Sequence, residues 1–195
     1  MPAGQLPRIA LGLAALALLA GCLDGGKPQE QRGELHGVLL IKWVREDRFV
    51  FVPDESDPLT YERGGRRIVP GAMFTDGGSI PRLFWSVKGL SPWSYGPAYA
   101  LHDWLFRQHR CGLDAPPMTY TLAEANEVLE DAIGILVAEG LAYGNAQVAS
   151  LIKGAVDQHG RAAWEGPCEP GPAALAAAAT AERSGDIIVG RIEIR

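Results

Sequence analysis

Two strand-forming runs and the turn between them occupy residues 38–52, VLLIKWVREDRFVFV. β-branched, aromatic and other large apolar residues dominate both runs, as is typical of strands. The acidic pair Glu46 and Asp47 lies between them, where a hairpin turn is expected. Shorter strand candidates follow at residues 67–69 and 72–74. The first half of the chain is therefore predicted to form a small antiparallel sheet.

The second half has the spacing of helices. Residues 97–108 begin with a proline, which the first turn of a helix tolerates. Thr121 and Glu124 have the spacing of a capping box, so a second helix is predicted from Thr121 to about residue 139. A third helix is expected over 145–160, with an asparagine cap at its start and a glycine at its end.

The C-terminal residues 186–195, DIIVGRIEIR, alternate apolar and polar side chains, which predicts a strand that returns to the N-terminal sheet. Residues 171–181 are mostly alanine and suit either a helix or a linker. We expect an α+β fold, a small N-terminal antiparallel sheet packed on about three C-terminal helices. The predicted domain spans 34–168, and an Ala-rich linker with the final strand occupies 169–195.

Length and charge restrict the class of protein. The chain has 195 residues, of which 47% are hydrophobic and 21% are charged, so it is long and apolar enough for one folded domain. Its formal net charge of −5 offers no basic excess for binding phosphates, so we expect no nucleic-acid partner. No protein partner is identifiable from the sequence.

The first residues resemble an export signal. Residues 1–22 read MPAGQLPRIALGLAALALLAGC, in which Arg8 precedes an apolar run too short to span a membrane. The ending LAGC, residues 19–22, resembles the lipobox of bacterial lipoproteins, in which cleavage precedes a cysteine that carries the lipid. Residues 1–21 would then be a lipoprotein signal peptide, and residues 22–33 a tether. The alternative is an ordinary signal peptide with a chance cysteine.

Lipidation of Cys22 implies a lipid membrane as partner and a location in the bacterial cell envelope. Because residue 23 is leucine and not aspartate, the sorting rules of such lipoproteins imply the outer membrane, facing the periplasm. The compartment is oxidising, so Cys111 and Cys168 are expected to form a disulfide. Two buried free thiols are the alternative.

Polar residues gather in two motifs and one helix. Residues 75–81 read TDGGSIP, residues 102–106 read HDWLF, and the helix from Thr121 carries Asn126 and Asp131. Together these motifs resemble a phage and bacterial family catalogued as domain of unknown function 1353, over residues 35–165. Its members usually carry aspartate where this chain has Asn126. The resemblance implies a phage relationship and no established activity.

A glycine-rich loop followed by a helical His-Asp pair is also similar to secreted phospholipases A2. That likeness implies a Ca²⁺-dependent hydrolase, with His102 as general base. Asp103, Asp76 and the carbonyls of Gly77 and Gly78 would hold Ca²⁺ or another divalent cation. The carboxylate that orients the histidine in those enzymes corresponds here to Asn126, and Asp131 is the other candidate.

A non-catalytic binding or assembly module of phage origin is the alternative function. In that case Asp76 caps a turn, and His102 is a buried histidine satisfied by hydrogen bonds. Asp103 would pair with Arg107 one helical turn later. His109 lies on about the same helix face as His102, so a two-histidine metal site and a lone surface histidine both remain open.

Overall fold

A computed structural model describes residues 32–44, 48–75, 88–89, 91, 93–116, 118–168 and 187–195 of the chain. The side chains of residues 44, 48 and 187–189 are outside this description. The predicted signal peptide, Cys22, most of the predicted tether and the Glu46–Asp47 turn also lie outside it. Residues from Gln31 onward form one compact unit, and the account below concerns that unit.

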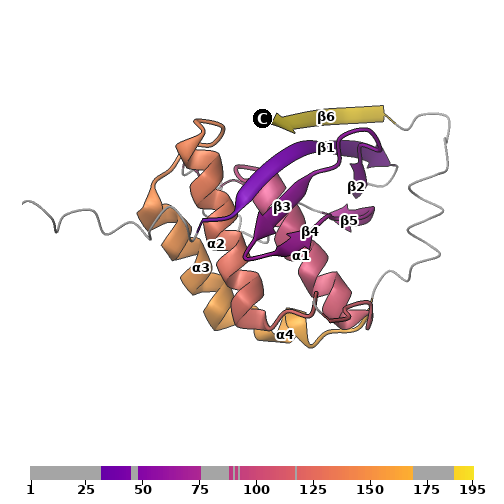
Figure 1. The fold of residues 1–195 in the computed structure, drawn as a ribbon, viewed down its shortest axis with the longest axis vertical. Helices are drawn as coiled ribbons and strands as arrows, with labels where there is room; N and C mark the ends of the chain where they lie inside the picture. The colour runs from indigo at the N-terminus through magenta and orange to yellow at the C-terminus, as the bar shows by residue number, and fades with distance from the viewer. Residues whose placement is uncertain are drawn as a thin grey trace, which may run out of the picture. The chain divides into compact units, whose positions relative to one another are not determined.

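The sheet is built around one long strand, β1, Glu34–Val44. Its neighbours run antiparallel to it, and the path through the sheet is β4-β3-β1-β2-β5, with β6 also paired to β1 (Figure 1). The other strands are β2 Arg48–Pro53, β3 Thr60–Arg63, β4 Arg66–Ile68, β5 Met73–Thr75 and β6 Ile187–Ile194.

Alternation along β1 turns one set of side chains toward the helices. Leu35, Leu39 and Ile41 are at odd-numbered positions, so their side chains face the same side of the strand, and all three belong to the hydrophobic core. Gly37 lies in the same strand at φ 97° and next to the Pro58 carbonyl, where an added Cβ would stand 2.2 Å from the oxygen. Only glycine fits this point of β1 without moving the chain.

Within the described residues, three long helices and one short helix lie between β5 and β6 in the sequence. They are α1 Gly96–Arg110, α2 Leu122–Ala138, α3 Ala146–His159 and the single turn α4 Arg161–Trp164. Local cap chemistry sets the starts of two of them. The side chain of Thr121 accepts from the Glu124 amide in a complete capping box, and Asn145 accepts from the Val148 amide.

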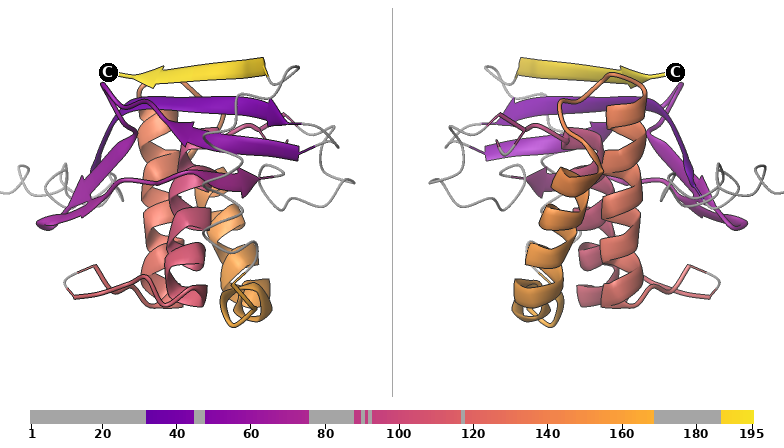
Figure 2. Two further views of the ribbon diagram at one scale, coloured as in Figure 1. Left: turned by 90° about the vertical axis from the view of Figure 1, so that its right-hand side faces the viewer. Right: turned by 90° about the vertical axis from the view of Figure 1, so that its left-hand side faces the viewer.

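The helices lie together on one side of the main strands, with their axes crossing the strand direction (Figure 2). One continuous core joins the two layers, with Phe51, Tyr61 and Ile68 from the sheet and Leu101 and Leu129 from α1 and α2. The predicted α+β fold is confirmed. So is the return of the C-terminal strand, since residues 187–194 pair with β1. Among the helices that the structure describes, none is both long and apolar enough to cross a membrane.

Candidate functional site

His102 lies in the middle of α1, on the side that packs against α2. Its residue is 8% exposed, and its ring contacts the Phe106 ring at 4.4 Å between centroids. Ring atom Nε2 lies 2.8 Å from Oδ1 of Asn126, which is fully buried on α2. The sequence placed an asparagine at the histidine-orienting position, and the structure brings these two side chains together.

The contact continues from α2 to α3. Asn126 Nδ2 donates to Asp157 Oδ1 at 2.7 Å. Lys153, one helical turn before Asp157, donates from Nζ to Asp157 Oδ2 at 2.5 Å. His102, Asn126, Asp157 and Lys153 therefore form a linear polar chain that begins at a buried ring and ends at an exposed ion pair. We call these four residues the polar chain.

Burial sets the charge state of this chain at its inner end. Loss of solvation lowers the pKa of His102 to about 4, while the hydrogen bond to Asn126 acts in the opposite direction and to a smaller extent. The imidazole is therefore neutral near pH 7. At the outer end the hydrogen bond from Lys153 lowers the pKa of Asp157, with a smaller contribution from Asn126, so this carboxylate is ionised.

Asp131 has a different role from the one expected. Its Oδ2 accepts from the Gly33 amide at 2.6 Å and from the Tyr61 hydroxyl at 2.7 Å. Positions 126 and 131 differ by five residues, about 140° around a helix, so they face different neighbours. The expectation that Asp131 orients His102 is corrected: Asn126 contacts the ring, and Asp131 ties α2 to the start of β1 and to β3.

Three of the four residues expected to hold a cation, Asp76, Gly77 and Gly78, lie outside the described residues. The fourth, Asp103, follows His102 on α1 and is half-buried. Its negative charge is a minor cause, behind burial and Tyr95, of the raised pKa of Tyr99. No three metal-ligating His, Cys, Asp or Glu side chains come together within the described part of the chain. The cation site therefore stays a prediction.

The far end of α1 is fixed by a disulfide between Cys111 and Cys168, which confirms the pairing predicted from the sequence. The disulfide joins the end of α1 to the segment after α4. Trp164 of α4 lies edge-on to Phe106 at 4.9 Å between centroids and stacks on His109 at 4.1 Å. His109 therefore packs with an aromatic ring at the end of α1, while His102 joins the polar chain.

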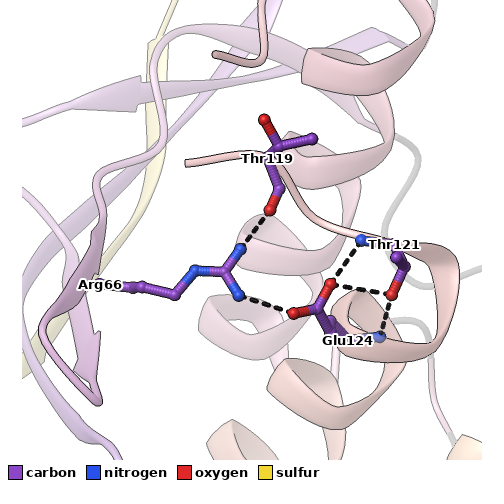
Figure 3. A network of polar contacts seen from close by, with 4 residues as sticks. All are labelled: Arg66, Thr119, Thr121 and Glu124. Carbon is purple, nitrogen blue, oxygen red and sulfur yellow. Dashed lines mark hydrogen bonds and ion pairs between the residues drawn. The ribbon is translucent and has the colours of Figure 1, made fainter. Parts of the chain in front are cut away.

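The N-terminus of α2, which carries Asn126, is held by a second polar network (Figure 3). Arg66 of β4 donates to Glu124 Oε1 at 2.8 Å and to the Thr119 carbonyl, and its guanidinium lies 3.4 Å from the centroid of the Tyr120 ring. Glu124 also closes the capping box with Thr121. The hairpin of β3 and β4 thereby fixes the first turn of α2, immediately before Asn126.

Sequence reasoning missed two members of the polar chain. Lys153 and Asp157 have the i,i+4 spacing of an ordinary helical ion pair, and that spacing was the available signal. Their connection to Asn126 depends on how α3 packs against α2.

Comparison of the chain with models of known protein families, with curated proteins and with solved structures gives no significant match.

Proposed function

We propose that this chain is a lipoprotein of the bacterial cell envelope whose domain is a metal-assisted hydrolase with His102 as general base. The observation that carries the proposal is the 2.8 Å contact between His102 Nε2 and Asn126 Oδ1. It holds the ring by one nitrogen, and a general base needs a held ring whose second nitrogen accepts a proton. The lowered pKa of His102 keeps the ring uncharged near neutral pH, as a base requires.

The similarity to phospholipases A2 suggests hydrolysis of a lipid ester or another bond of the envelope. His102 would take a proton from water as the water oxygen attacks the ester carbonyl carbon, and would return that proton to the leaving alkoxide. Asp103, Asp76 and the carbonyls of Gly77 and Gly78 would hold the cation, since Ca²⁺ prefers carboxylate and carbonyl oxygens. A bound divalent cation supplies positive charge next to the oxyanion.

The anchor would keep the domain near lipid. The predicted tether runs from Cys22 to Gly33, and a chain of that length reaches at most on the order of 40 Å when extended. Cells fed a labelled fatty acid should label the protein and retain it in the membrane fraction. The Cys22→Ala variant should lose both the label and the retention.

Two measurements on the full chain in detergent micelles test the hydrolase. Calorimetric titration with CaCl₂ should release or absorb heat, and Ca²⁺ should raise the melting temperature. Phospholipid in the same micelles should be hydrolysed, and His102→Gln should abolish this hydrolysis while the control His109→Gln retains it. If Ca²⁺ causes neither heat nor a change in melting temperature, the proposed cation site is excluded. If no hydrolysis depends on His102, the proposed hydrolase activity is excluded.

The second candidate is a non-catalytic module of phage origin, and the burial of the inner end of the polar chain, His102 and Asn126, favours it. His102 is only 8% exposed, Asn126 is fully buried, and Phe106 packs on the imidazole. In this case the contacts form an interhelical joint. His102→Gln would then lower the melting temperature, and the wild-type chain would hydrolyse no phospholipid with or without Ca²⁺.

A further inference from the structure

We propose that Asp157 is a positioning residue that places the proton of the His102 ring on Nε2, acting through the side-chain amide of Asn126. The catalytic meaning of this inference rests on the proposed function. The assignment of the proton depends on the geometry alone. The juxtaposition that carries it is the polar chain, in which α1 and α2 each contribute one side chain and α3 contributes two to one line of hydrogen bonds.

The first step concerns the outer end of the chain. An ionised carboxylate accepts hydrogen bonds and donates none. Asp157 Oδ2 is occupied by the Lys153 ammonium at 2.5 Å, and Oδ1 lies 2.7 Å from Asn126 Nδ2. The Asn126 amide must therefore turn its NH₂ group, its only donor, toward Asp157. Turning the amide by 180° would direct one oxygen at another, which is repulsive.

The second step concerns the inner end. With its NH₂ group facing Asp157, Asn126 presents its carbonyl oxygen Oδ1 to His102. An amide oxygen only accepts, so the ring nitrogen at 2.8 Å must be the donor. The neutral ring then carries its hydrogen on Nε2 and its lone pair on Nδ1. The acceptor-only character of Asp157 thus selects one of two histidine tautomers across two hydrogen bonds.

The third step is what this arrangement does for a base. Direct contact with a carboxylate would stabilise the charged imidazolium and raise its pKa. A neutral amide between ring and carboxylate transmits orientation but carries no net charge. The polar chain therefore fixes which nitrogen is available to take a proton, Nδ1, while His102 stays neutral. Asp157 acts through Asn126 and touches no reacting atom.

Nuclear magnetic resonance of the full chain in micelles, with ¹⁵N-labelled histidine, reads the tautomer directly. Two-bond ¹H–¹⁵N correlations distinguish a ring protonated at Nε2 from one protonated at Nδ1. Near pH 7 the wild type should show His102 with its hydrogen on Nε2. In Asp157→Ala the amide has lost its acceptor, so the Nδ1-protonated form should appear and both ring nitrogens should shift toward averaged values.

Three further variants complete the test. Asp157→Glu keeps an acceptor and should restore the wild-type spectrum, and Lys153→Met keeps Asp157 and should leave the tautomer on Nε2. Asp157→Asn, which preserves size, serves if the alanine variant does not fold; it should also admit the Nδ1 form, because its own amide can turn. A wild-type ring protonated at Nδ1, or an unchanged ring in the folded Asp157 variants, overturns the inference.

Activity provides a separate readout. Where wild-type hydrolysis is found, Asp157→Ala should lower kcat on the order of tenfold at unchanged KM, because the base is misoriented while substrate contacts remain. An unchanged kcat together with a changed tautomer would refute the positioning role. Where the wild type hydrolyses nothing, the proposed function fails, and the spectra alone still decide whether Asp157 places the proton.

Discussion

The free energy of unfolding should fall steeply as the pH drops from 7 to 5, and the buried ring of His102 should cause a defined part of that fall. In the folded chain burial lowers the pKa of His102 to about 4, whereas the ordinary value is 6.5. Between these two values the unfolded chain binds a proton and the folded chain does not. Stability contributed by the neutral ring is therefore present above pH 6.5 and is lost as the pH falls.

The size of the loss follows from the two pKa values. The proton-binding constants differ by a factor of roughly 300 between the unfolded and the folded chain, which is about 3 kcal/mol once the pH lies well below 4 and the loss is complete. About 2 kcal/mol of this is already lost between pH 7 and pH 5. Three carboxylates of the described residues have a lowered pKa, Asp54, Glu124 and Asp157, and they titrate mostly below that range.

The measurement is urea denaturation of the wild type and of His102→Gln at pH 7, 6 and 5. Glutamine has an amide hydrogen that can still be donated to Asn126 Oδ1, and it does not titrate. Every other ionisable group is common to both proteins, so the difference between the two pH dependences isolates His102. We expect the wild type to lose about 2 kcal/mol more than the variant between pH 7 and pH 5.

Equal pH dependences of the two proteins would refute the reasoning. That result would mean that His102 is solvated, or is paired with an acid that keeps its pKa near the ordinary value. A wild type that gains stability relative to the variant as the pH falls would mean that the folded ring binds its proton more tightly than the unfolded one. Either outcome would place the ring in a different environment from the one described above.

Three further variants test the contacts around the polar chain. Tyr61→Phe should lower the free energy of unfolding by about 1–3 kcal/mol in urea denaturation, because it leaves Asp131 without its hydroxyl donor. The matched control Tyr99→Phe should be neutral or stabilising, since the buried Tyr99 hydroxyl has no hydrogen-bond partner among the described residues. A larger loss of unfolding free energy in Tyr99→Phe than in Tyr61→Phe would contradict the stabilising role of the Tyr61 hydroxyl. Glu124→Ala should cost about 1–2 kcal/mol by breaking the capping box and the Arg66 contact, whereas Glu127→Ala, exposed on the same helix, should cost under about 0.5 kcal/mol. Removing the disulfide in Cys111→Ser/Cys168→Ser should lower the free energy of unfolding by about 4 kcal/mol, as the chain-entropy relation gives for a 57-residue separation. Equal urea-denaturation midpoints of the wild type with and without reductant would argue against a bridge in solution.

Elements with local signals were predictable from the sequence. The starts of α2 and α3 were placed at Thr121 and Asn145 because a side-chain cap needs only the next three residues. Strand β3, Thr60–Arg63, was missed because its four residues are too few for a clear alternation and include two charges. Its formation depends on pairing with β1 and β4, which no local pattern contains.

The candidate site also has one feature that the sequence could predict and one that it could not. The pairing of His102 with position 126 was within reach, since the likeness to phospholipases A2 implies a histidine-orienting side chain on an antiparallel helix, and Asn126 lies at the corresponding position. The choice between Asn126 and Asp131 was not, because it depends on the rotation of α2 about its axis. That rotation is set by contacts remote in sequence, with Tyr61 and Gly33 on one side and Asp157 on the other.

The amide at position 126 also determines which charge state the interior can hold. An aspartate there would place a carboxylate next to a ring that burial keeps neutral, and the pair would either ionise together or share a proton. With asparagine, the negative charge lies one hydrogen bond farther out, on Asp157, where Lys153 and solvent stabilise it. Asn126→Asp should therefore raise the pKa of His102, measurable from the same ring ¹⁵N shifts over pH. An unchanged pKa in a folded variant would show that the residue at 126 does not control the charge of the ring.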